Sequence, residues 1–160
     1  MTSLRTHHVY ARTVLVAVFA LAFGAKTRAA EVNFLYAQTT SAQCSTNCFP
    51  NVPIDGLSFT LPAATRTFNA AVVTLNMPNL TLSAGGLADV SVLSQINGAV
   101  FASAAINNTY TPLTIVVKVS LKRTTQPIAA EWVPSNGATM STQFSSISAV
   151  LVKDDSQTDQ

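Results

Sequence analysis

Histidine is almost absent from this chain of 160 residues, and both copies, His7 and His8, lie near its beginning. The rest of the chain therefore lacks the imidazole that activates serine or cysteine nucleophiles and that ligates many catalytic metals. Cysteine is also scarce, and Cys44 and Cys48 alone cannot complete a tetrahedral zinc site. We therefore expect no conventional enzyme, no metal site and no cofactor.

Charge is the second shortage, since charged residues make up only 10% of the sequence. Four of the nine basic residues lie within the first 30 positions, and the remainder carries five basic and seven acidic residues, dispersed along the chain. Binding to a phosphate backbone relies on clustered Lys and Arg. Nucleic acid is therefore not an expected partner.

The one long apolar run, Val14 to Ala25, follows a basic start and is too short to span a bilayer. Small residues follow it, with a cleavage point after Ala29 and alternatives close by. We predict that residues 1–30 are a secretory signal peptide, with an uncleaved anchor or a buried helix as the alternative. The mature chain is then secreted, periplasmic or on the cell surface, with no membrane span after the signal is removed.

Period-two alternation marks the rest of the sequence. From Leu113 to Lys122, five aliphatic residues alternate with polar ones and with Val116, which predicts a half-buried strand. Further strands are predicted at 32–36, 57–61, 68–76, 80–82, 89–96, 99–106, 128–133, 138–141 and 146–153. No helical stripe is present. The sequence predicts one all-β domain over residues 31–153, an antiparallel β-sandwich or jelly roll of about 8–10 short strands, with a polar tail at 154–160.

Turn signals divide these strands. Asn97-Gly98 and Asn136-Gly137 each separate two strand-like runs, which predicts two β-hairpins. Met77-Pro78 is expected to interrupt one strand. The stretch from Gln38 to Asp55, which contains two prolines, is expected to be the longest irregular segment.

The two cysteines are separated by three residues and follow an export signal. Nearby thiols in an oxidising compartment usually pair, so we expect a structural disulfide between Cys44 and Cys48. A redox-active pair is the alternative, but it usually has two intervening residues at a helix start.

Few side chains suggest a site. Carboxylates such as Asp55, Asp89 and Glu131 permit a glycosidase-like pair only if two of them face each other across a cleft. Trp132 is expected in the core, because it shares its alternation side with apolar residues. Tyr110 lies beside a polar run and is a candidate for sugar stacking. Two sequons begin at Asn79 and Asn107.

The last predicted strand, Ser141 to Val152, resembles the closing strand of C1q/TNF-like jelly rolls, in which Phe-Ser-Gly-aromatic-Leu is typical. Phe144-Ser145 matches this pattern, whereas Ser146 replaces the glycine and Ile147 replaces the aromatic residue. The resemblance covers this strand only. It implies a trimer packed around apolar strands, with a binding or scaffolding role and no catalysis.

Two functions follow from these observations. The first is a non-catalytic, self-associating structural, surface or assembly protein, which forms a homo-oligomer such as a trimer. The alternative is an extracellular recognition module that binds a glycan or another surface protein. A carboxylate-dependent glycosidase is third. The ligand-binding residues are not identified by the sequence.

Overall fold

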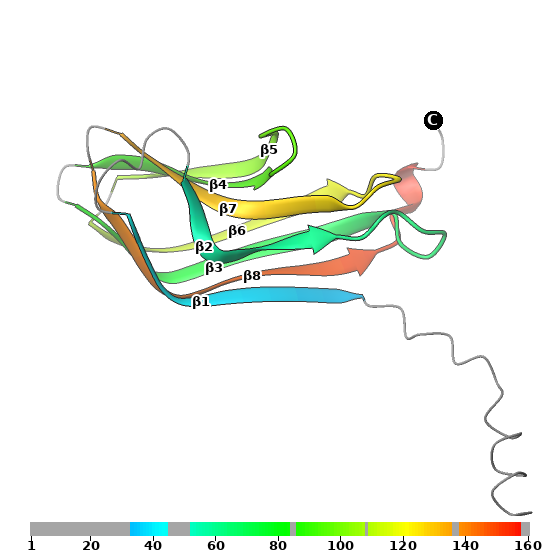
Figure 1. Ribbon diagram of the computed structural model, residues 1–160, viewed down its shortest axis with the longest axis horizontal. Helices are drawn as coiled ribbons and strands as arrows, with labels where there is room; N and C mark the ends of the chain where they lie inside the picture. Colours follow the sequence, from blue (N-terminus) through cyan, green and yellow to red (C-terminus); the bar gives the residue numbers. More distant parts are fainter. Residues whose placement is uncertain (1–32, 45–51, 84–85, 108, 136–137, 158–160) are drawn as a thin grey trace, which may run out of the picture. The chain divides into compact units, whose positions relative to one another are not determined.

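The computed structural model describes residues 33–44, 52–83, 86–107, 109–135 and 138–157. These residues form two four-stranded antiparallel sheets that pack face to face (Figure 1). The strands are β1 (Phe34–Cys44), β2 (Val52–Leu61), β3 (Ala70–Leu82), β4 (Leu87–Ser94), β5 (Val100–Ile106), β6 (Tyr110–Ser120), β7 (Gln126–Ser135) and β8 (Met140–Val152), followed by the 3-10 turn η1 (Asp155–Gln157). The predicted signal peptide at 1–30 lies outside the described residues.

The strand order identifies the sandwich as a jelly roll. One sheet has the order β1-β8-β3-β6 and the other the order β2-β7-β4-β5. The first and last strands, β1 and β8, thus lie side by side. The chain crosses repeatedly between the two sheets, as in two Greek keys. The predicted fold class is therefore confirmed, with eight strands.

One of the two predicted hairpins is present. β4 and β5 pair directly, and the amide of Gly98 donates to the carbonyl of Ser94 at 2.9 Å. Only Gly98 of the Asn97-Gly98 pair has a positive φ, 67°, so the turn is longer than a two-residue type I′ turn. The hairpin predicted at Asn136-Gly137 is wrong, because the strands on either side of it belong to different sheets. The two turn residues themselves lie outside the described part.

In the segment expected to be irregular, Gln38 to Asp55, residues 38–44 and 52–55 are strand, and residues 45–51 lie outside the described part. β1 continues to Cys44 because all of its residues except Thr40 have a partner in β8, as far as the pair Cys44 and Met140. β2 begins at Val52 and carries a register shift between Pro53 and Ser58. Likewise, Pro78 does not end β3, which continues to Leu82 beyond a shift in its pairing with β6.

The core lies between the two sheets and is made by the inward rows of both. Its largest fully buried side chains include Trp132, Leu57, Leu61, Leu75, Ile128 and Ile147. Ile115 and Val119 of β6 also face inward, whereas Val116 and Lys118 are exposed, as the alternation predicts. Trp132 is confirmed as a core residue. A buried aliphatic side chain contributes about 1.5–3 kcal/mol, so this shared core holds the sheets together.

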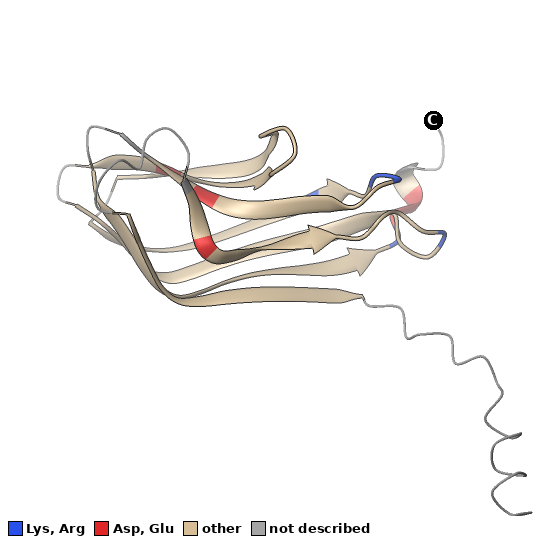
Figure 2. Ribbon diagram, in the orientation of Figure 1, with Lys and Arg blue, Asp and Glu red and all other residues tan. Residues whose placement is uncertain are grey.

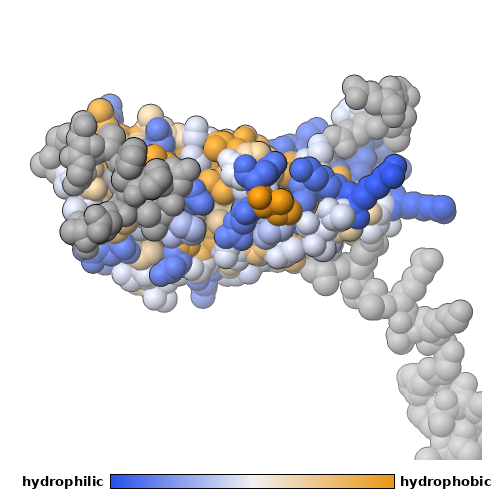
Figure 3. Space-filling view, turned by 45° about the horizontal axis from the view of Figure 1, so that its top comes forward, coloured by the Kyte–Doolittle hydropathy of each residue, from blue (hydrophilic) through white to orange (hydrophobic). Residues whose placement is uncertain are grey.

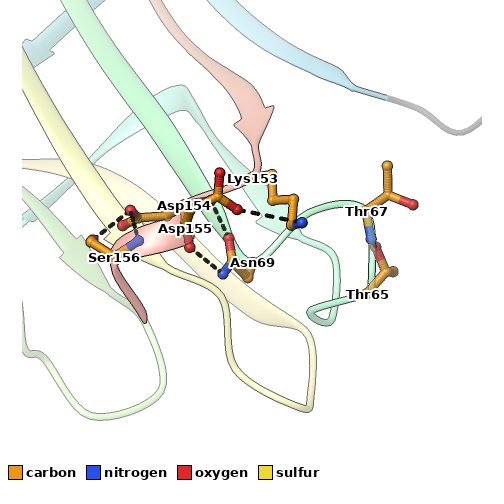
Figure 4. A network of polar contacts seen from close by, with 7 residues as sticks. All are labelled: Thr65, Thr67, Asn69, Lys153, Asp154, Asp155 and Ser156. Carbon is orange, nitrogen blue, oxygen red and sulfur yellow. Dashed lines mark hydrogen bonds and ion pairs between the residues drawn. The ribbon is translucent and has the colours of Figure 1, made fainter. Parts of the chain in front are cut away.

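The last strand is tied to the start of β3 by a polar clamp (Figure 4). The side-chain Nδ2 of Asn69 donates to the carbonyl of Asp154 at 2.8 Å, and the backbone N–H of Asp154 donates back to the Asn69 side-chain oxygen. The Asp154 carboxylate accepts from Ser156 and lies 2.7 Å from the Lys118 ammonium group. The polar tail is thus anchored at its first residue. No helix among the described residues is long and apolar enough to cross a membrane.

Candidate binding surface

The β1-β8-β3-β6 sheet turns one face to the core and the other, its outer face, to solvent. Cross-strand partners on one face form rows, because successive side chains of a strand alternate between faces. Three rows of the outer face are Phe34, Val150, Val72 and Lys118; Tyr36, Ser148, Thr74 and Val116; and Gln38, Ser146, Asn76 and Thr114. The first row thus holds three apolar residues and Lys118, and the rows beyond it hold an increasing number of hydroxyl and amide groups.

Two aromatic residues of β1 lie side by side on this face. Phe34 is 52% exposed and Tyr36 is 53% exposed. Their ring centroids are 6.2 Å apart, with an angle of 19° between the ring planes. The Tyr36 hydroxyl donates to Oε1 of Gln38 at 2.9 Å, which holds the amide beside the ring. An aromatic surface bordered by an ordered amide results.

The sheet bends at Phe144, a third exposed aromatic residue, which belongs to β8. Gln143 and Phe144 are exposed in succession, while Thr142 and Ser145 on either side are fully buried and hydrogen-bonded to each other. Phe144 has a φ of 53°, in the left-handed region that non-glycine residues avoid, and its side chain is 68% exposed. The bend is visible in β1 and β8 in Figure 1. It turns an apolar ring out to solvent at a conformational cost.

Beyond the bend, Tyr110 of β6 completes the set. It is 58% exposed, and its hydroxyl donates to Oδ1 of Asn79 at 2.8 Å. Thr114 donates in the same way to Oδ1 of Asn76 at 3.2 Å. Within the described residues, no acceptor contacts the Nδ2 groups of these two asparagines. Each asparagine side chain is thus held by a hydrogen bond to its Oδ1 atom. Each keeps the two N–H donors of its Nδ2 group for a ligand.

The outer face carries almost no charge, since the described strands β1, β8, β3 and β6 hold one charged residue, Lys118. Lys118 is paired with Asp154, and the hydrogen bonds from Lys118 and Ser156 lower the pKa of Asp154 to about 2. Figure 2 shows most strand surface in tan, with Lys and Arg gathered toward the end near η1. A neutral ligand suits this surface better than an anion or a cation.

The candidate carboxylates lie on the other sheet. Glu131 of β7 is paired across strands with Ser91 of β4, and Asp89 follows two residues away on that strand. Glu131 is only 8% exposed, and burial raises the pKa of its carboxyl. Asp55 lies in β2, within the register shift of its pairing with β7. These acids lie on one sheet and do not face each other from opposite walls, and the described residues hold no cluster of three metal-ligating side chains.

The same side of the sandwich carries an apolar hairpin tip. Ile96 and Val100 flank the β4–β5 turn and are both exposed. Figure 3, in which the top of Figure 1 comes forward, shows apolar surface at the position of this tip with hydrophilic surface around it. It carries no aromatic residue and no ordered amide, so it lacks the mixture of groups found on the outer face of the other sheet.

The remaining sequence predictions have mixed outcomes. Cys44 is buried at the end of β1, but Cys48 lies outside the described residues, so the disulfide stays a prediction. Of the site candidates, Tyr110 lies on the outer face. Sequence reasoning did not select Phe34 or Tyr36, because these residues alternate with apolar neighbours that face the core, which hides the period-two signal.

Comparison with known proteins gives similarity of fold without a family. No family model matches the chain, and no curated protein matches it. The VP2 subviral particle of infectious bursal disease virus aligns at 9% identity with a TM-score of 0.50, over 74% of this chain and 32% of the viral protein.

Two other similar structures are a sugar-binding protein, the EclA C-terminal domain, and Eiger TNF from S. frugiperda. The first has 16% identity and a TM-score of 0.46, covering 68% of this chain and 77% of its own. The second has 14% identity and a TM-score of 0.47, covering 81% and 99%. Membership of the C1q/TNF-like family is not shown, because no family model and no curated protein match. The chain is a jelly-roll β-sandwich.

Proposed function

We propose that this protein is an exported, non-catalytic recognition module that binds a neutral carbohydrate on the outer face of the β1-β8-β3-β6 sheet. One observation carries the proposal: four exposed aromatic residues share one neutral face with oriented amides and hydroxyl groups. These residues are Phe34, Tyr36, Tyr110 and Phe144.

The chemistry of a sugar explains why this combination matters. A pyranose ring has an apolar C–H face, which packs against an aromatic ring, and a rim of hydroxyl groups that donate and accept hydrogen bonds. The outer face offers both partners next to each other, since Tyr110 holds the Asn79 amide and Tyr36 holds the Gln38 amide.

Catalysis is not part of the proposal. The four described strands of this sheet contain no carboxylate, and Asp154, just after β8, is paired with Lys118. The acids of the opposite sheet lie beside one another, an arrangement that does not place an acid and a base on two sides of a scissile bond. Export remains part of the proposal and depends on the predicted signal peptide.

The test is a glycan screen with the secreted protein, followed by calorimetry on the best ligand. Removing the ring in Tyr110→Ala uncovers roughly 60 Å² of apolar contact, or about 1.5 kcal/mol, so we expect about tenfold weaker binding. Ile96→Ala, on the hairpin tip of the other sheet, is the matched control and should bind like the parent protein. A screen without any neutral glycan ligand, or unchanged binding by Tyr110→Ala, would refute the proposal.

A second candidate function is the self-associating structural or surface component expected from the sequence. The open edge of β1 favours it, because an unprotected edge strand is a template for pairing with another chain.

A further inference from the structure

The edge of β1 presents hydrogen-bonding groups that the fold does not use. β1 ends the β1-β8-β3-β6 sheet and pairs only with β8. The amide of Leu151 donates to the carbonyl of Asn33 at 2.8 Å, so these two residues form a hydrogen-bonded pair. Hydrogen-bonded pairs alternate along an antiparallel ladder. Leu35 and Ala37 therefore bond to β8, and the backbone groups of Phe34 and Tyr36 point outward.

Only the first part of this edge is open. Gly56 of β2, with a φ of 79°, lies against β1 at Gln38, where a Cβ atom added to the glycine would be 3.0 Å from the Gln38 carbonyl oxygen. β2 thus covers the edge from Gln38. Within the described residues, nothing bonds to the outward backbone groups of Phe34 and Tyr36.

β1 also lacks the features that prevent an edge strand from pairing with a strand of another chain. Its eleven residues, FLYAQTTSAQC, include no proline and no charged residue. The other three edge strands each have a protective feature. β6 carries Pro112 and Lys118, β2 carries Pro53 and Asp55 beside a register shift, and β5 is only seven residues long. Of the four edges, β1 is therefore the one suited to pairing with another strand.

We propose that two copies of this chain pair through β1, antiparallel and about a two-fold axis at Leu35. The outward groups of Phe34 then exchange hydrogen bonds with the partner's Tyr36, and those of Tyr36 with the partner's Phe34. The side chains of each such pair lie directly opposite on the outer face, as aromatic cross-strand pairs.

A second copy is favoured over an unrelated strand because this segment is self-complementary. The two aromatic residues stand at equal distances from Leu35, so the two-fold axis places each against an aromatic partner. Within the described strands of this sheet no like charges meet, since their one charged residue, Lys118, lies on the opposite edge strand. The pairing closes on itself and gives a dimer whose two sheets join into one.

The test is the molar mass of the secreted protein, with its N terminus determined, by light scattering over a dilution series. We expect a dimer that dissociates on dilution. Tyr36→Lys places a charge at the open edge and should raise the dimer dissociation constant at least tenfold. Tyr110→Lys makes the same change to an exposed tyrosine on the opposite edge strand, and should leave the dissociation constant unchanged.

Backbone amide exchange gives a second measurement that does not depend on a variant. The outward amides of Phe34 and Tyr36 should exchange more slowly as the protein concentration rises. A monomer at every concentration, a stable trimer, or equal effects of the two lysine variants would overturn the β1 pairing. Glycan binding tested with Tyr110→Ala is a separate readout, so either proposal can fail without the other.

Discussion

Phe144 allows the cost of the sheet bend to be measured. Its φ of 53° lies in the left-handed region, which costs a non-glycine residue about 1–2 kcal/mol. Alanine at this position keeps that cost, whereas glycine removes it. A glycine variant is in turn less stable than an alanine variant by about 0.5–1 kcal/mol of unfolding free energy, because glycine gives the unfolded chain more entropy. We therefore expect Phe144→Gly to be more stable than Phe144→Ala by about 0.5–1 kcal/mol.

Val116 is the matched control, because it is also exposed on the outer face but lies in regular strand. At this position the alanine variant should be the more stable one, with Val116→Gly less stable than Val116→Ala by about 0.5–1 kcal/mol. The difference between the two positions is then the left-handed strain itself, about 1–2 kcal/mol.

Urea unfolding of the four variants, followed by tryptophan fluorescence of the buried Trp132, measures these differences. One kcal/mol corresponds to about 2–4 °C in Tm for a chain of this size. If glycine were the less stable residue at both positions, Phe144 would not be strained, and the bend would have another origin.

Two further predictions concern ionisation. The pKa of Asp154 is lowered to about 2, so its contribution to stability is present above its usual value of 3.8 and is lost as the pH falls toward 2. Lys118→Met should raise the pKa of Asp154, so less stability should be lost as the pH falls from 3.8 toward 2. Unfolding at several pH values and NMR titration of the Asp154 carboxyl group measure these two effects. An unchanged titration of Asp154 would contradict the ion pair. Burial raises the pKa of Glu131 above 4.5, so its ionisation destabilises the folded state as the pH rises through the raised value. Glu131→Gln should therefore be more stable than the parent protein at pH 7 but not at pH 4, and equal effects at both values would argue against burial as the cause.

The strands could be predicted where one face is apolar and the other polar. β6 is the clearest case, because its aliphatic residues face the core and alternate with exposed residues such as Lys118. The second half of β1, QTTSAQC, has small or polar residues on both faces, so its sequence resembles a loop. It is a strand because β8 supplies a hydrogen-bonding partner along its length. A sequence pattern contains no information on such a distant partner.

The order of strands was less accessible than their positions. Asn-Gly at 97–98 joins two strands of one sheet, whereas Asn-Gly at 136–137 joins strands of different sheets. The local turn signal is the same in both cases. Whether the chain returns to the same sheet depends on which sheet offers a partner for the next strand, and that is a property of the whole fold.

The candidate binding surface depends on the same long-range information. Phe34 and Val116 share the outer face although 81 residues separate them in sequence, because β8 and β3 lie between their strands in register. Tyr110 was selected from its polar neighbours alone. Its relation to Asn79 and to the other three aromatic residues follows only from the bend and the register shift.

The position of β8 between β1 and β3 has a consequence for how the chain folds. β1 has no partner strand within its own sheet until β8, the final strand, is available, and Phe34 pairs with Val150. Contacts between residues so far apart in sequence slow folding, since a long loop must close before they contribute. The sandwich cannot be completed until nearly the whole chain has emerged from the ribosome. The order of the strands thus makes completion of the fold a late event, whatever the order in which the inner strands pair.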